Sequence, residues 1–236
     1  MNAAVQTSAT LDSRPAERRA RPRGAHPLAA LSPALVAAHA PAGSQAESLR
    51  ELRSQLLLRW FHEHRTLAVI GAHEQDGADV VAANIAIAMA QLGESTLLID
   101  ANLRDPRQHL LFGLRPIAGL SALLQNRDVH TEAVMSVPAV EHLHVICAGN
   151  LPANPQELVS RTPLIYLLKT LPERFRAVIV ATPPALAYAD AQIIAARARG
   201  CVLVTRRHRT RVADVARVKS QLEPAQAVLL GAVIRE

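Results

Sequence analysis

Short apolar runs alternate with segments of helical length from residue 47 to residue 236, and this alternation constrains the fold more than any other feature. The runs predict buried strands at 66–72, 95–101, 143–149, 175–182, 200–206 and 227–234. Helical segments precede or separate them, at 47–61, 78–93, 118–126, 155–171, 187–199 and 211–222. Strands that are apolar throughout and joined by helices are typical of a mostly parallel sheet with helices on both faces. We therefore expect a three-layer α/β/α domain over residues 47–236.

In such a sheet, ligands bind where the strands end. The loops that follow Ala72, Asp100, Gly149, Thr182 and Thr205 are therefore the expected functional edge.

Residues 1–46 differ in composition from the rest of the chain. They combine proline and small residues with a basic cluster that consists of Arg14, Arg18, Arg19, Arg21 and Arg23. A segment of this kind buries too little apolar area to offset its chain entropy, so we predict a largely disordered tail. The basic cluster is either simply solvated or attracted to an anionic membrane face, at about 1 kcal/mol per arginine.

Composition excludes several classes of protein. The chain is 50% hydrophobic, carries a formal net charge of +6 and has no apolar run long enough to cross a bilayer. Aromatic residues make up 3% of the chain, which disfavours stacking on bases, so nucleic acid is an unlikely partner. Cys147 and Cys201 are too few for a disulfide framework, and the histidine spacing does not suit a metal, so no metal site is expected.

Six segments in one order resemble the bacterial tyrosine kinases of capsule and exopolysaccharide synthesis, which are P-loop proteins related to partitioning ATPases. The segments are ESLRELR at 47–53, LLIDANLRDP at 97–106, GLSALL at 119–124, AGNLPANPQELV at 148–159, VIVATPPALAYADA at 178–191 and the closing LLGAVI. The resemblance implies a P-loop fold, with ATP and magnesium as the ligands of the family.

The phosphate loop departs from the family pattern S-A-x-x-G-E-G-K-S/T. Gln75 replaces the first glycine, while Asp76 and Gly77 keep the acid and the second glycine. Ala78 stands where the family has the lysine that neutralises phosphate, and Asp79 where it has the hydroxyl that holds magnesium. A carboxylate about 4 Å from a phosphate charge opposes binding by roughly 4 kcal/mol at an effective dielectric constant near 20.

Two other motifs lose acidic groups. Asn102 replaces the second aspartate of the 97–106 motif, and Ala181 replaces the distal aspartate before Thr182. The resemblance leaves Asp100 and Arg104 as residual catalytic residues of doubtful activity. It leaves a degenerate nucleotide site formed by Asp76, Gly77, Ala78, Asp79, Asp100, Asn102 and Thr182.

We expect weak or absent binding of ATP and magnesium at this site. Asp76 or Asp79 could cap the following helix with its carboxylate, in the place that a phosphate takes in the family. The alternative is an ordinary N-cap in a loop that has lost its nucleotide motif, with no consequence for signalling.

Glu47, Arg50 and Arg53 match a family motif that pairs subunits in a ring; the alternative is a weak local ion pair. A second basic cluster at 206–211 follows a predicted strand and suits phosphate groups or the acidic tail of a partner, or is only a solvated loop.

The resemblance implies a regulatory, kinase-like subunit in the cytoplasm, peripheral to the inner membrane. Its expected partners are a membrane chain-length-determinant protein and copies of itself, with a possible membrane contact through the N-terminal tail. Two alternatives stay open: an active ATP-binding tyrosine autokinase, and a partitioning-type scaffold on a membrane or DNA.

Overall fold

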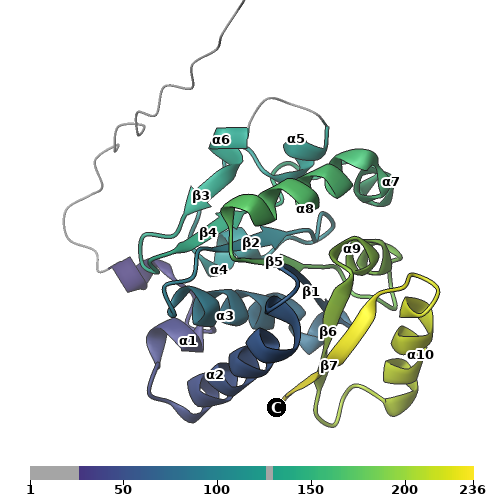
Figure 1. Ribbon diagram of the computed structural model, residues 1–236, viewed down its shortest axis with the longest axis horizontal. Coiled ribbons are helices and arrows are strands. Elements are labelled where there is room, and N and C mark those ends of the chain that lie inside the picture. The colour runs from purple at the N-terminus through teal and green to yellow at the C-terminus, as the bar shows by residue number, and fades with distance from the viewer. Residues whose placement is uncertain (1–26, 126–129) are drawn as a thin grey trace, which may run out of the picture.

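The computed structural model describes residues 27–125 and 130–236, which form a sheet covered by helices on both faces (Figure 1). The strand order is β3-β4-β2-β5-β1-β6-β7. Neighbouring strands are parallel except for β3, which runs antiparallel to β4. The predicted mostly parallel three-layer fold is confirmed.

The strands are β1 (Thr66–Gly71), β2 (Thr96–Asp100), β3 (Val134–Ser136), β4 (Leu143–Ile146), β5 (Ala177–Ala181), β6 (Gly200–Arg206) and β7 (Val228–Arg235). The α-helices are α1 (Val36–His39), α2 (Ser44–Leu56), α3 (Ala78–Ala90), α4 (Gln108–Leu111), α5 (Leu120–Leu124), α6 (His130–Ala133), α7 (Pro155–Ser160), α8 (Thr162–Arg174), α9 (Asp190–Ala198) and α10 (Val212–Leu222). Short 3-10 turns at Pro27–Ala30 and Glu74–Asp76 and a π-helical turn at Leu57–Phe61 complete the list. No helix among the described residues is long and apolar enough to span a bilayer.

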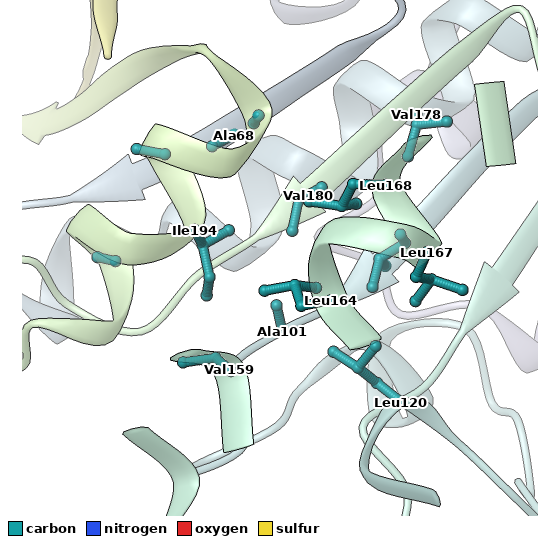
Figure 2. Close-up of a cluster of buried hydrophobic side chains, with 14 of the residues drawn as sticks. Ala68, Ala101, Leu120, Val159, Leu164, Leu167, Leu168, Val178, Val180 and Ile194 are labelled. Carbon is teal, nitrogen blue, oxygen red and sulfur yellow. The ribbon is translucent and has the colours of Figure 1, made fainter. Parts of the chain in front are cut away.

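Two hydrophobic cores lie on opposite faces of the sheet, because successive side chains of a strand point to opposite sides. In β1, Ala68 and Ile70 belong to one core, whereas Leu67 and Val69 belong to the other. Helices α5, α7, α8, α9 and α10 cover the first core, and α1 to α4 cover the second. Figure 2 shows Leu164, Leu167 and Leu168 of α8 packed over the first core.

Two elements differ from those expected, one because of a local backbone break and one because the strand is short. The helix expected at 155–171 is divided at Arg161, whose extended backbone (φ −72°, ψ 160°) ends α7. Pro163 then lies in the first turn of α8, where its missing N–H costs nothing. Strand β3, a three-residue edge strand, was not expected because so short a run has no visible periodicity.

Residues 27–46 are folded, so the prediction of a largely disordered tail over residues 1–46 is wrong for this part. Residues 1–26, which include the basic cluster, lie outside the described residues. Leu31, Leu35 and Ala37 are buried in the core that contains α3. The Asn84 side chain of α3 accepts a hydrogen bond from the Ala37 N–H (2.9 Å) and donates one to the Ala34 carbonyl (3.0 Å). The segment folds because α3 offers it both an apolar surface and a polar partner.

Candidate functional site

A cavity of about 180 Å³ lies where β1, β2 and β5 end. Each strand contributes the loop that follows it, as expected for a parallel sheet. The lining residues are Gly71, His73, Glu74, Ala78, Asp79, Asn102, Asp105, Arg107, Thr182 and Pro184.

The loop between β1 and α3 is folded into a closed 3-10 turn. The N–H groups of Asp76 and Gly77 donate to the carbonyls of His73 and Glu74, at 3.2 and 3.3 Å. The buried Asp76 carboxylate accepts the His73 N–H (2.8 Å) and the Thr210 hydroxyl (2.6 Å). These backbone donors are therefore engaged within the turn, whereas an anion-binding loop directs its donors at the ligand.

Helix α3 begins at Ala78 without a side-chain cap, because its N-cap residue is Gly77. Asp76 points away to Thr210, and Asp79 makes no capping hydrogen bond. The hypothesis that either aspartate caps this helix in place of a phosphate is therefore wrong for this structure.

Gly77 has a left-handed backbone (φ 69°, ψ 39°), and a guanidinium lies directly over it. A Cβ added at Gly77 would collide with Nη1 of Arg235, the last residue of β7. The same Nη1 donates to the Asp76 carbonyl at 3.2 Å. The positive φ favours glycine here, whereas the flexible Arg235 side chain could move aside for a Cβ.

Asp100 shapes the loop after β2. Its buried carboxylate accepts the N–H groups of Asn102 (3.3 Å), Arg107 (3.1 Å) and Gln108 (2.9 Å). Burial raises the pKa of Asp100 to about 7, and the nearby charge of Asp79 adds to the increase, while the three N–H donors oppose it. Asp100 thus holds the backbone of this loop.

Asn102 and Arg104 are also engaged in holding this loop. The Asn102 amide accepts the Asp105 N–H (3.1 Å) and donates to the Asp105 carbonyl (2.8 Å). The Arg104 guanidinium makes two hydrogen bonds, at 2.8 and 3.0 Å, to the buried carboxylate of Asp190 at the start of α9. It also lies 4.0 Å from the centre of the Tyr188 ring. Arg104 faces α9 and does not line the cavity.

The end of β5 presents a methyl group and a hydroxyl. Ala181 is 2% exposed and has no side chain that could order a magnesium shell. The Thr182 hydroxyl donates to backbone carbonyls of Val69 (3.2 Å) or Pro183 (3.1 Å).

The cavity lining is rich in acidic residues. Carboxylates of Glu74, Asp79 and Asp105 line it against a single guanidinium, Arg107, which is paired with Asp105 at 2.6 Å. Three acidic residues beside one paired guanidinium give this lining a negative charge. Among the described residues, no three His, Cys, Asp or Glu side chains are grouped to hold a metal ion.

Four of the residues expected at the nucleotide site line this cavity, and their role in binding a nucleotide stays a prediction. Ala78, Asp79, Asn102 and Thr182 line the cavity together, with Asp100 buried behind them and Asp76 turned aside. The lining residues that were not predicted are Gly71, which ends β1, and His73, Glu74, Asp105, Arg107 and Pro184 in the loops that follow the strands. Their position directly after the strand ends is the signal that would have found them.

The proposed subunit-contact residues make contacts within the chain. Arg50 donates to Glu47 and to the Pro41 carbonyl, the latter at 2.5 Å. Arg53 donates to the Ala88 carbonyl of α3 at 3.0 Å, and partial burial lowers its pKa. Their role between subunits stays a prediction.

Together, fold and site define a P-loop-type α/β domain whose phosphate loop is closed and acidic. No protein-family model matches the chain. It is 31% identical over 197 residues to the putative tyrosine-protein kinase CapB of Staphylococcus aureus, covering 83% of this chain and 86% of CapB. It is 33% identical over 201 residues to the tyrosine-protein kinase YwqD of Bacillus subtilis, covering 85% and 84%.

Solved structures agree with these relatives. The chimerical protein CapA2B2 superposes with a TM-score of 0.80 at 30% identity, covering 85% of this chain and 88% of that one. The kinase domain of Escherichia coli ETK gives 0.81 at 30% identity, covering 85% and 79%. The chain belongs to the bacterial tyrosine-protein kinases. The cell-division ATPase MinD of Pyrococcus furiosus, with a TM-score of 0.62 at 22% identity, shares the fold alone.

Proposed function

We propose that this protein is a regulatory, kinase-like subunit of capsule or exopolysaccharide synthesis and chain-length control, with impaired ATP binding and phosphotransfer. The family membership supports the pathway, since relatives include the "putative tyrosine-protein kinase in cps region" of Klebsiella pneumoniae. The single observation that carries the impairment is the closed turn at 74–77, with Ala78 and Asp79 at the start of α3.

The proposed partner is a membrane chain-length-determinant protein, which would keep this subunit in the cytoplasm at the inner membrane. The loop from Asp100 to Arg107 suits such a contact, because hydrogen bonds to Asp100 and the Arg104–Asp190 ion pair hold its backbone in place. A rigid loop loses little entropy when it binds.

Self-association is the second part of the proposal. Glu47 and Arg50 are side chains of α2 that retain exposure, at 59% and 32%, and so remain accessible to a neighbouring copy. The measurement is analytical ultracentrifugation of the wild type and of Glu47→Ala; a sedimentation coefficient that is unchanged by the substitution would count against this interface.

Calorimetric titration of the full chain with magnesium-ATP tests the impairment. We expect a Kd weaker than about 1 mM for the wild type. A variant that restores the family residues, Gln75→Gly with Ala78→Lys, Asp79→Thr and Ala181→Asp, should bind at least about 100-fold more tightly, a gain of roughly 3 kcal/mol.

Leu110→Lys is the matched control, because it adds a lysine at an exposed position on α4 outside the cavity lining. It should leave the affinity for magnesium-ATP unchanged. Micromolar, magnesium-dependent binding by the wild type together with phosphate transfer to tyrosine would establish the alternative of an active autokinase and end this proposal.

A further inference from the structure

We propose that the arginine loop, residues 206–211 between β6 and α10, docks directly on the anionic lipid headgroups of a bilayer. This inference goes beyond the proposed function, because it requires no membrane protein as an intermediary. Arg206, Arg207, His208, Arg209 and Arg211 are all exposed. Figure 1 shows this loop beside the C-terminal end of β7.

The arginine loop is held in one shape by hydrogen bonds. The N–H groups of Arg209 and Thr210 donate to the Arg206 carbonyl, at 3.1 and 2.9 Å. The Thr210 hydroxyl accepts the Arg206 N–H (2.8 Å) and donates to the buried Asp76 carboxylate (2.6 Å). The Arg207 N–H donates to the Arg235 carbonyl at 2.7 Å. The backbone that carries the arginines is therefore ordered before any ligand binds.

The positive charge of the arginine loop is poorly neutralised by the protein. Glu236 approaches Arg207 at 3.3 Å and is itself exposed. Asp214 is engaged by His73 at 3.1 Å and by the Arg211 N–H at 3.2 Å. Within residues 27–125 and 130–236, no carboxylate lies within 4.0 Å of the guanidinium groups of Arg206, Arg209 or Arg211.

Exposed apolar side chains lie next to the arginine loop in the sequence or in the sheet. They favour a lipid surface over other polyanions as the ligand of this loop. Val212, which directly follows Arg211, is 85% exposed, and Ile234, which pairs with Thr205 across the sheet, is 68% exposed. Guanidinium groups beside exposed aliphatic groups fit the boundary between headgroups and acyl chains. A nucleic acid offers these aliphatic side chains no apolar medium, and the chain has few aromatic residues for stacking on bases.

Co-sedimentation of the full chain with vesicles tests the inference. The probes are vesicles of phosphatidylglycerol with phosphatidylcholine, and vesicles of phosphatidylcholine alone. We expect binding only to the anionic vesicles, and a loss of affinity of about fivefold for each arginine charge removed. Arg206→Glu with Arg209→Glu should therefore weaken binding at least about 25-fold.

The matched control is Arg217→Glu with Lys219→Glu, which makes the same change in net charge at exposed positions along α10. It should weaken binding less than about threefold if the arginine loop is the contact. A second variant, Val212→Ser with Ile234→Ser, keeps all charges and should reduce the binding that remains at high salt. Because all these positions are at the surface, circular dichroism should show unchanged thermal unfolding.

Four outcomes would overturn the inference. The first is equal loss in the arginine-loop and control variants, which indicates a general charge effect. The second is loss only when the N-terminal arginines 18, 19 and 21 are replaced by serine. The third is release by inorganic phosphate at constant ionic strength, which indicates a free-phosphate site. The fourth is that the arginine-loop variant loses affinity for duplex DNA but retains its affinity for vesicles. None of these outcomes changes the magnesium-ATP titration, so the two proposals fail separately.

Discussion

Replacing Asn84 by alanine tests whether residues 31–40 belong to the folded domain. Asn84 satisfies the N–H of Ala37, whose side chain is 1% exposed, and the carbonyl of Ala34, which lies in an exposed residue. An unsatisfied buried N–H costs about 1–3 kcal/mol, whereas a carbonyl that can reach water loses only about 1 kcal/mol of net hydrogen bonding. We therefore expect Asn84→Ala to lower the free energy of unfolding by about 2–4 kcal/mol.

Urea unfolding measures this change, and hydrogen exchange locates it. The amides of residues 35–40 should lose protection in Asn84→Ala before those of the sheet do, because the segment can detach locally. Asn150→Ala removes the same type of side chain at an exposed position and should change stability by less than about 0.5 kcal/mol. A stability of Asn84→Ala as close to wild type as that of the control would refute the reasoning.

Three further perturbations test the site. Arg104→Ala leaves the buried carboxylate of Asp190 without its cation. It should therefore lower the free energy of unfolding, measured in urea, by about 3–5 kcal/mol. If Arg104→Ala is less destabilising than Arg104→Lys, the ion pair does not contribute to stability as described. Asp100 has a folded pKa of about 7 against about 3.9 when unfolded, so the folded state retains a proton between these values. Stability should therefore fall as pH rises from about 4 to 7, by at most about 4 kcal/mol, and this slope should be absent in Asp100→Asn. Gly77→Ala puts a Cβ on a left-handed backbone and should lower the melting temperature. Because the flexible Arg235 side chain can move aside, adding Arg235→Ala should restore little of the loss, and full restoration would argue against backbone strain as the cause.

The sheet could be predicted from the sequence because its central strands are apolar on both faces. Leu67 to Ile70 and Val178 to Val180 are fully buried, so the run itself carries the signal. Residues 31–40 could not be predicted in this way. Their burial depends on Asn84, which lies far along the chain and reveals its partner only when α3 is in place.

The site was predictable in position but not in detail. The strand ends indicated where Ala78, Asp79, Asn102 and Thr182 would lie, and these residues line the cavity there. The ion pair of Arg104 with Asp190 joins residues 86 positions apart, and the closed turn at 74–77 depends on Thr210 from another loop. Contacts of this kind follow from the order of strands in the sheet, which residue types alone do not specify.

The hydrogen bond from Thr210 to Asp76 joins the turn at 74–77 to the arginine loop. Reopening the turn for a nucleotide would break this bond and release the arginines from their fixed arrangement. By reciprocity, any surface that binds the ordered arginines would disfavour nucleotide entry by the same factor. Nucleotide binding at the cavity and membrane binding at the arginine loop would then oppose each other. A relative that binds ATP should therefore have a lower affinity for membranes.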